Sequence, residues 1–269
     1  MSLPLANPSV ERDLLARGIE SDCTYFEMGA QLEQLEGATV AWMPGLTRSP
    51  AAAVVHRVDP EAIASGGAGW IASAEAAMAN VGAALCRIYL DGRHKLADDM
   101  LRNAGYAARD ELIFVDALPE SSINLTLCPV ATDADWAEKL SFHKAAGGTP
   151  DGHGNGPADW VELERRKCSA GMEAFLARLD GEVVGAVGAI WCDKFVRTKN
   201  LVVHPDHRGR GVAQAMLGGI TALGRRRGTP EQCVVAVKGE KGELLYRRLQ
   251  MPMIGYQVEW SKPIAGGAR

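Results

Sequence analysis

Residues 200–217 read Asn-Leu-Val-Val-His-Pro-Asp-His-Arg-Gly-Arg-Gly-Val-Ala-Gln-Ala-Met-Leu, and this stretch decides the fold. The apolar, β-branched run at residues 201–203 is typical of the end of a buried strand. The proline and aspartate at residues 205–206 stop that strand. Two glycines at residues 208–211 then lead into an alanine-, leucine- and methionine-rich helix, expected from residue 212 to about 227. The stretch therefore predicts a strand, a glycine loop and a helix N-terminus in direct succession.

Such a junction is suited to bind a phosphate or pyrophosphate. The first turn of a helix leaves backbone N–H groups unpaired, and the helix dipole makes that end positive. Glycines let those N–H groups approach a bulky anion without an intervening Cβ. The glycine spacing is not that of a Rossmann fingerprint, and no Gly-Lys-Ser/Thr follows as in a P-loop.

The motif Arg208-x-x-Gly211-x-Ala213, after a strand ending in Val-Val-His-Pro, resembles the coenzyme A loop of the GCN5-related N-acetyltransferase (GNAT) superfamily. The resemblance extends over about residues 124–260 and includes the Leu-Tyr-x-x-Leu signature around Tyr246. The elements expected after the helix follow the family's order, namely a strand at 232–237, a helix at 242–249 and a strand at 254–260. The resemblance implies an acetyl-CoA-dependent acyltransferase.

The resemblance also implies which residues form the site. Main-chain groups of residues 201–203 would hold the pantetheine arm and the thioester oxygen, acting as an oxyanion device. Arg208 would either contact a phosphate or only fix the loop. The implied cofactor-binding residues are Leu201, Val202, Val203, Arg208, Gly209, Arg210, Gly211, Val212, Ala213, Gln214 and Gly239.

Tyr246 stands at the position of the family's general acid, where a phenol can donate its proton to the departing sulfur. The alternative is a core tyrosine at helical spacing with Leu245 and Leu249. The sequence departs from the family nearby, because Gly239 replaces a frequent asparagine and Gln-Met at residues 250–251 replaces a usual Gly-Phe. These departures put cofactor contacts around residue 239 in doubt.

No general base can be identified from the sequence. The strand expected at residues 195–203 contains no carboxylate. A proton transfer relayed by water is an alternative to a side-chain base. His204 and His207 flank the glycine loop and are expected to set its conformation rather than to catalyse. The side chains that could serve as base are Glu173, Asp193, Glu162 and His143.

The remainder of the C-terminal half fits the same fold. An Asp-Gly turn at residues 180–181 between apolar runs predicts a hairpin. Thr132 or Asp133 is expected to cap a helix. The glycine-rich segment 147–157 is either a surface loop or a substrate lid. The other expected elements are a strand at 124–128, helices at 134–143 and 159–168, and the hairpin strands at 172–179 and 182–191.

The N-terminal half repeats this pattern weakly. Its expected elements are a helix at 7–20, strands at 39–43, 52–58, 85–90 and 111–115, and helices at 60–63, after 66–69 and at 95–103, with a linker at 118–122. Four segments match later ones in the same order: 54–56 with 202–204, 66–69 with 209–211, 86–92 with 233–239, and 101–106 with 246–251.

The expected fold class is therefore α/β with a mixed sheet, with a GNAT fold in the C-terminal half and a degenerate GNAT-like N-terminal half. We expect residues 1–118 to form a domain without its own cofactor site and residues 119–269 to form the catalytic domain. The first copy lacks an arginine before its glycines, and Leu101 stands where Tyr246 stands.

Composition narrows the functional classes. The chain has 269 residues, 47% of them hydrophobic, and a net charge of −4, which argues against general nucleic-acid binding. Arg225, Arg226 and Arg227 end a helix, where cations favour the dipole. No apolar run reaches a membrane span and the start lacks a signal-peptide pattern. Six scattered cysteines form no CxxC pair, so we expect no metal and a cytoplasmic location.

The sequence thus predicts a transferase that moves an acetyl group from coenzyme A to a primary amine of a small molecule or a peptide. The thioester would be attacked directly by the amine. The protein would act as a monomer or homodimer, without nucleic-acid or membrane partners. The alternative is a non-catalytic acyl-CoA-binding regulatory module on the same fold, for which the departures at Gly239 and residues 250–251 leave room.

Overall fold

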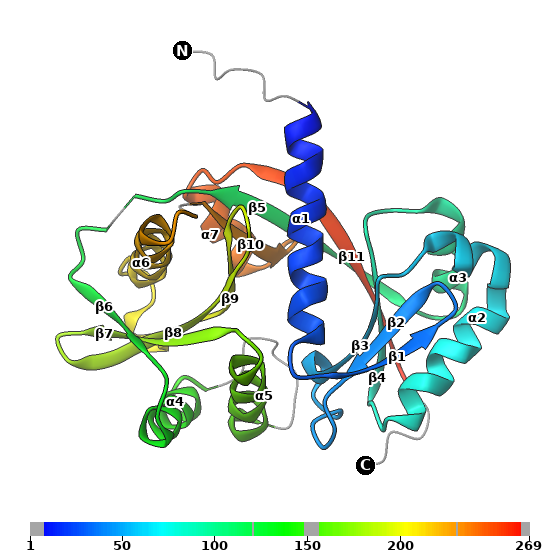
Figure 1. Ribbon diagram of the computed structural model, residues 1–269, viewed down its shortest axis with the longest axis horizontal. Coiled ribbons are helices and arrows are strands. Elements are labelled where there is room, and N and C mark those ends of the chain that lie inside the picture. Colours follow the sequence, from blue (N-terminus) through cyan, green and yellow to red (C-terminus); the bar gives the residue numbers. More distant parts are fainter. Residues whose placement is uncertain (1–7, 120, 148–155, 230, 265–269) are drawn as a thin grey trace.

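A computed structural model describes residues 8–119, 121–147, 156–229 and 231–264. These residues form one mixed sheet of eleven strands in the order β1-β2-β3-β4-β11-β5-β10-β9-β8-β7-β6. Helices cover both faces of this sheet (Figure 1). Most of the segment predicted to be a surface loop or substrate lid, residues 148–155, lies outside the described residues. None of the helices within the described parts combines the length and apolar character that a bilayer-crossing segment needs.

The C-terminal half has the elements that its sequence predicts. Thr132 caps α4 in a reciprocal capping box with Asp135. The hairpin turn places Asp180 and Gly181 at φ 52° and 87°. The elements are β6 Leu125–Pro129, α4 Asp133–Ala145, α5 Pro157–Ser169, β7 Glu173–Leu179, β8 Glu182–Trp191, β9 Val196–Val203, the 3-10 turn η2 Pro205–His207, α6 Val212–Arg226, β10 Gln232–Val237, α7 Lys241–Arg248 and β11 Met253–Pro263.

The N-terminal half contains one strand, β1, that was not expected. The two helices expected at residues 60–63 and after residues 66–69 meet in α2 at a kink, where Gly67 has the non-helical angles φ 55° and ψ −135°. The elements are α1 Pro8–Glu27, β1 Gln31–Leu35, β2 Ala38–Trp42, the 3-10 turn η1 Pro50–Ala52, β3 Ala53–His56, α2 Pro60–Asn80, β4 Leu85–Leu90, α3 Lys95–Asn103 and β5 Ala107–Asp116.

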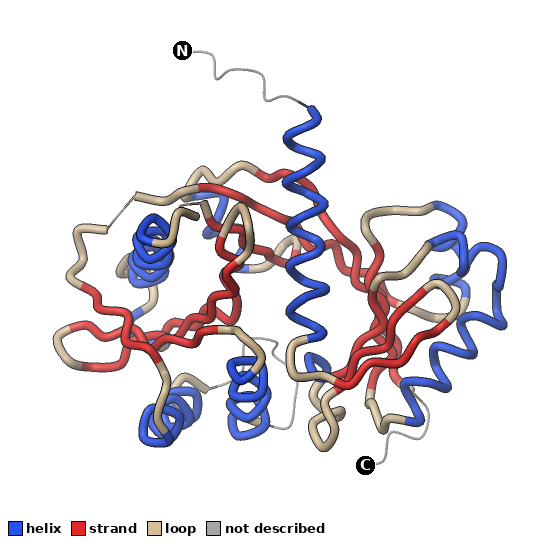
Figure 2. The backbone as a smooth tube through the Cα atoms, viewed as in Figure 1, coloured by secondary structure: helices blue, strands red, loops and turns tan. Residues whose placement is uncertain are grey.

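The last strand of each half lies in the sheet of the other half. Strand β5 pairs along β10, with Gln232 opposite Asp116 and Val237 opposite Glu111. Strand β11 pairs along β4, with Val258 opposite Leu90. The two exchanged strands also pair with each other, so the strands continue without a break through the centre of the molecule (Figure 2). The division at residues 118 and 119 therefore separates the halves along the chain but not within the sheet.

Both halves have the same topology when the sheet is followed outward from the β11–β5 pair. One direction gives β4, β3, β2 and β1, and the other gives β10, β9, β8 and β7. Three of the four sequence matches fall on equivalent elements; residues 54–56, for example, end β3 as residues 202–203 end β9. The fourth does not, because residues 66–69 lie within α2 whereas residues 209–211 precede α6. Among the described elements, β6 has no counterpart, and two helices, α4 and α5, precede the β7–β8 hairpin where α1 alone precedes β1 and β2, so the first copy is the shorter one.

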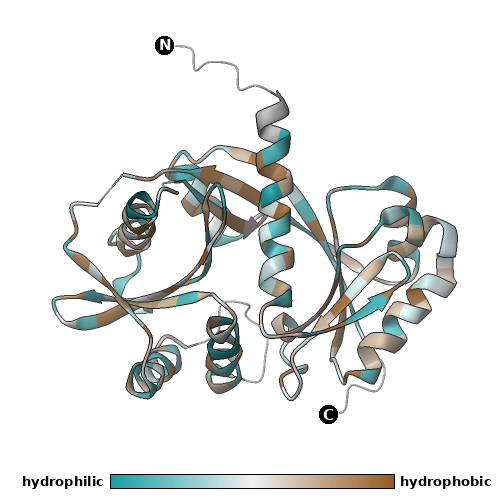
Figure 3. Ribbon diagram, viewed as in Figure 1, coloured by the Kyte–Doolittle hydropathy of each residue, from teal (hydrophilic) through white to brown (hydrophobic). Residues whose placement is uncertain are grey.

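The helices divide between the two faces of the sheet. Helix α6 packs on β6, β8, β9 and β10, whereas α4 contacts β8 and α5 contacts β7 on the other face. Helix α1 lies against β11, β2 and β3 in front of the sheet, and apolar and polar residues alternate along it (Figure 3). The core of the N-terminal half contains Trp260 of β11, so the exchanged strand completes that core.

Candidate functional site

The neighbouring parallel strands β9 and β10 separate soon after they begin. They pair only at Gln232 with Val196 and at Cys233 with Arg197. Beyond these pairs, the two strands present main-chain groups toward each other without a shared ladder. The carboxyl ends of adjacent parallel strands are a common position for ligand sites in α/β sheets. This separation therefore marks the candidate site.

A bulge lies in β9 where the strands separate. Ala186 pairs with Val202 and Gly188 with Lys199, so Asn200 and Leu201 together oppose a single residue of β8. Asn200 has φ 56°, a left-handed conformation that non-glycine residues rarely adopt. A bulge frees peptide groups from the ladder and re-aims them. Main-chain groups of residues 201–203 are thus available at the separation of the strands.

The glycine loop ends at the N-terminus of α6. Gly209 and Gly211 have φ 74° and 80°, and Gly211 is the N-cap without any side-chain cap. The first helical N–H bond of α6 runs from Ala215 to the Gly211 carbonyl at 2.9 Å. The N–H groups of residues 212–214 precede that bond and face outward from the helix end. The left-handed backbone at Gly211 favours glycine, whereas a Cβ there would meet only the far end of the Ile123 side chain, at 2.9 Å.

Arg208 binds the loop to the strand. Its Nε donates to the Val203 carbonyl at 3.1 Å. The sequence left two roles open for Arg208, contact with a phosphate or fixing of the loop, and this hydrogen bond supports the second. His204 accepts a hydrogen bond from the Asp206 N–H at 3.4 Å, and its ring lies 5.9 Å from that of His207. These contacts join the histidines to the loop's own residues.

Tyr246 lies in the core beside the separated strands. Its residue is 7% exposed and packs in a cluster with Phe114 and Leu249, as a core tyrosine would. Burial raises the pKa of Tyr246 to about 12, although the positive charge of Arg197 opposes the rise. The phenol is therefore protonated at neutral pH. A proton-donor role and a packing role are compatible in this position.

Gly239 lies in the turn between β10 and α7. Its backbone has φ 84° and its N–H donates to Glu243 Oε2 at 2.6 Å. Glu243 also accepts from Arg247 Nε at 2.7 Å. Because the Gly239 N–H already donates a hydrogen bond to the Glu243 carboxylate, this N–H is engaged within the protein. The predicted cofactor contact at Gly239 has the weakest geometric support in the predicted set.

The candidate bases are engaged by side chains other than Tyr246. Each of three carboxylates is paired with an arginine, and the imidazole of His143 is fully buried beside Glu164. The pairs are Glu173 with Arg227 at 2.8 Å, Asp193 with Arg17 at 3.4 Å and Glu162 with Arg166 at 2.8 Å. Across the described ranges, no group of three or more His, Cys, Asp or Glu side chains is arranged to hold a metal ion.

A buried polar network joins β9 to α1, and the sequence did not reveal it. Asp22 accepts hydrogen bonds from Arg197 at 2.7 Å, from Lys199 at 2.9 Å and from Gln257 at 2.9 Å. Burial alone would raise the pKa of Asp22, but the charges of Arg197 and Lys199 outweigh it and lower the pKa to about 2. The signal for this network was the pair Arg197 and Lys199, two cationic residues inside a strand that ends in an apolar run.

The equivalent region of the N-terminal half is already filled by its own side chains. Asp59 caps α2 by accepting the Glu61 N–H at 3.0 Å, so a carboxylate occupies the helix end that Gly211 leaves open in α6. Strands β3 and β4 also separate, pairing only at Val55 with Ile88. The fully buried Ile63 of α2 lies in the apolar core that they share.

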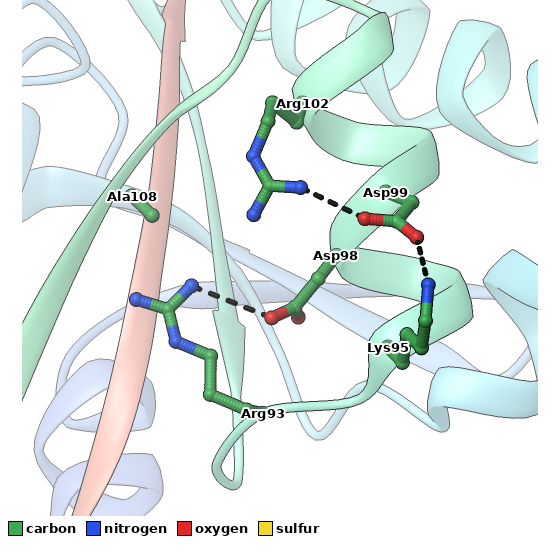
Figure 4. Close-up of a pocket in the computed structure, with 6 residues that line it drawn as sticks. All are labelled: Arg93, Lys95, Asp98, Asp99, Arg102 and Ala108. Atoms are coloured by element: carbon green, nitrogen blue, oxygen red, sulfur yellow. Dashed lines mark hydrogen bonds and ion pairs between the residues drawn. The ribbon is translucent and has the colours of Figure 1, made fainter.

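A surface depression lies elsewhere in the N-terminal half, beside α3 and β5 (Figure 4). Its charged side chains pair with one another. Arg93 lies 3.4 Å from Asp98, and Asp99 accepts from both Lys95 and Arg102 at 2.8 Å. The depression therefore presents little net charge to an anionic ligand.

Taken together, a mixed sheet with two separating parallel strands, a bulge and a glycine loop at a helix N-terminus define an acetyltransferase-type α/β fold. Residues 171–250, which hold the separating strands, the bulge and the glycine loop, match the acetyltransferase (GNAT) domain family. This segment of the C-terminal half is thus similar to GNAT domains. No curated protein matches the sequence.

Solved structures share the fold over most of the chain. A functionally unknown conserved protein from Staphylococcus epidermidis has TM-score 0.65 at 12% identity, covering 88% of this chain and 96% of its own. A GCN5-related N-acetyltransferase from Kribbella flavida has TM-score 0.63 at 17% identity, covering 93% and 96%. A tandem GNAT protein from the clavulanic acid biosynthesis pathway has TM-score 0.55 at 12% identity, covering 85% and 78%. The degenerate GNAT-like first half predicted from the sequence is thus confirmed at the level of the fold.

Proposed function

We propose that this protein is an acetyl-CoA-dependent N-acetyltransferase that acts on a primary amine of a small molecule or peptide. The separation of β9 from β10 beside an uncapped, glycine-led helix N-terminus carries this proposal. Backbone N–H groups at residues 209–214 would hold the pyrophosphate of the cofactor, with Arg210 adding charge from its exposed position. The glycine conformations and the absence of a side-chain cap fit such an anion.

The bulge supplies the second element of the reaction. A main-chain donor of residues 201–203, freed from the ladder, would polarise the thioester carbonyl as negative charge develops on its oxygen. The acceptor amine would approach from the face that α1, α4 and α5 cover. Since three of the four candidate bases are held by arginines and the fourth is buried, we propose that water removes the amine proton.

Tyr246 would assist the departing sulfur. A thiol has an ordinary pKa of about 8.5, well below that of Tyr246, which burial raises to about 12. A complete proton transfer from the phenol to a thiolate is therefore uphill, and the hydroxyl would act chiefly by donating a hydrogen bond. The thiolate can leave without full protonation, so the proposed role is assistance rather than an absolute requirement.

Ligand binding and turnover test the proposal together. Millimolar CoA or acetyl-CoA should raise the melting temperature, since a ligand at 100 times its Kd stabilises the folded state by about 2.7 kcal/mol. Release of free thiol from acetyl-CoA should then depend on one member of a panel of amines and peptides. Binding without turnover against that panel would favour a non-catalytic acyl-CoA-binding module. No thermal shift at millimolar ligand would contradict both functions.

A further inference from the structure

The left-handed residue of the β9 bulge, Asn200, is held from both sides by its own side chain. Its Oδ1 accepts a hydrogen bond from the Tyr25 hydroxyl at 3.3 Å, and its Nδ2 donates to Glu164 Oε1 at 3.0 Å. A strained backbone conformation persists only where its surroundings determine it. These two hydrogen bonds are such a determinant.

Glu164 is a fixed support because it is fully buried. Its Oε2 lies 3.1 Å from Lys139 Nζ and 3.7 Å from His143 Nε2, and all three side chains have no exposed surface. A buried carboxylate beside a buried ammonium group has little freedom to move, since separating the two charges inside the protein is costly. The Glu164 side of Asn200 is thus anchored by α4 and α5.

Tyr25 is the second support, and it comes from the N-terminal half. Its ring centroid lies 4.0 Å from Lys167 Nζ and 4.2 Å from Lys199 Nζ, and Lys167 also donates to the Tyr25 carbonyl. The residue is 4% exposed. Cation–π contacts on a buried ring hold its orientation. The hydroxyl that reaches Asn200 is therefore presented by a fixed side chain of α1.

We propose that Tyr25 is a positioning residue for acyl transfer: through Asn200 it fixes the β9 bulge and so aims the main-chain donor that follows it. The inference rests on the acetyltransferase function proposed above. It gives the N-terminal half a specific task, which is to complete the reacting site of the C-terminal half without binding the cofactor. Glu164 performs the same task from within the C-terminal half.

Three variants separate positioning from simple support of the fold. Tyr25→Phe keeps the ring between its lysines and removes only the hydroxyl. It should lower kcat by about three- to tenfold, the range that one neutral hydrogen bond sustains, with the KM for acetyl-CoA nearly unchanged. Asn200→Ala should lose more kcat than Asn200→Gly, because glycine adopts a positive φ without strain whereas alanine does not. The melting temperature of each variant is recorded alongside.

Tyr106→Phe is the matched control, since it removes a hydroxyl that donates to Glu75 at 3.2 Å elsewhere in the N-terminal half. It should leave kcat unchanged. Wild-type kcat in Tyr25→Phe, or equal kcat in Asn200→Ala and Asn200→Gly, would overturn the inference while leaving the acetyltransferase function intact. Failure of the wild-type chain to bind CoA would instead count against the function itself.

Hydrogen exchange gives a readout that needs no activity. Amides of residues 199–203 should exchange faster in Tyr25→Phe and Asn200→Ala than in the wild-type protein, because the bulge loses a support, whereas Tyr106→Phe should match the wild type there. Unchanged exchange in this segment of Tyr25→Phe would show that the hydroxyl does not hold the bulge, whatever the enzyme's turnover.

Discussion

The ring of Tyr246 lies 5.5 Å from the ring of Phe114, tilted by 55°. Phe114 belongs to β5, the strand that the N-terminal half contributes to the sheet beside β10. The proposed proton donor is therefore seated on a residue from the other half of the chain. Its ring packing and its hydroxyl can be separated experimentally, because only the hydroxyl is removed by phenylalanine.

Tyr246→Phe should lower kcat while leaving CoA affinity almost unchanged. General acid assistance is worth about 10²–10⁴-fold, and a thiolate leaving group places this case at or below the lower end. The pKa of Tyr246, raised to about 12 by burial, also implies that its deprotonation should not reduce kcat anywhere near neutral pH. Steady-state kinetics with the identified amine, from pH 6 to pH 9, measures both effects.

The control for this variant is its melting temperature. Retained packing against Phe114 should keep it close to the wild-type value. If Tyr246→Phe turns over at the wild-type rate while chemistry limits turnover, Tyr246 is a core residue and the proton comes from water.

Gly211→Asp should lower CoA affinity by at least about 10²-fold, because a carboxylate placed against the pyrophosphate costs several kcal/mol. The chain should still fold, since the nearest atom to a new Cβ is the mobile end of Ile123. Gly228→Asp is a matched control at the opposite end of α6: its φ of 81° equals that of Gly211 within a degree, and no atom lies within 4 Å of its Cβ position. Calorimetric titration that finds equal affinities in the two variants would remove the loop from the site.

Titration of the wild-type chain should give one CoA per chain. In the N-terminal half, Asp59 already occupies the end of α2 and Arg57 is engaged by Glu20 and Glu27 at 2.6 Å. An anion there would meet a carboxylate rather than free N–H groups. Calorimetry that detects two equivalent sites would contradict this prediction, as would a full-strength site remaining in Gly211→Asp.

Lys167→Met should change the pH dependence of stability. Burial lowers the pKa of Lys167 from 10.5 to about 7, with Lys199 adding to the shift. Between pH 7 and pH 10.5 the unfolded chain binds more protons at Lys167 than the folded chain does. The free energy of unfolding of the wild-type protein therefore increases as pH rises through this range. The stability of Lys167→Met relative to wild type should thus be greatest near pH 6 and decline toward pH 9, by at most about 1.4 kcal/mol per pH unit.

Urea unfolding at several pH values measures that difference. The exposed Lys144→Met is the control for the loss of a lysine at the surface. A difference between Lys167→Met and wild type that does not vary with pH would mean that Lys167 keeps its proton on folding.

Local sequence signals predicted much of the fold. The residue limits of α3 and β10 agree with the limits expected from apolar spacing, and the Thr132 cap and the turn at Asp180 are in place. Strand β1 was missed because three of its five residues are polar and its two leucines, Leu32 and Leu35, are three positions apart and do not alternate with polar residues. The strand exchange was missed for a different reason: periodicity shows that a segment is a strand, but not which partner it chooses.

The candidate site was predicted unevenly. The residues of the glycine loop are contiguous in the sequence, and the expected anion binding follows from the unpaired N–H groups of the helix that comes next. The sequence alone was therefore enough to identify this loop. The support of Asn200 is not local, since Tyr25 and Glu164 are 175 and 36 residues away from it. Charged residues such as Lys139 and Glu164 are expected at the surface of a helix, and only the three-dimensional structure shows that they are buried together.

The exchanged strands give the molecule the arrangement of a domain-swapped dimer within a single chain. Each half completes its sheet with the final strand of the other half, as two subunits do when they trade an identical element. Here the covalent link between the two halves replaces association from solution by an intramolecular encounter at high effective concentration. Assembly of the two halves is consequently independent of protein concentration. The N-terminal half can lack a cofactor site of its own and still be required, because its strand β5 completes the sheet of the C-terminal half.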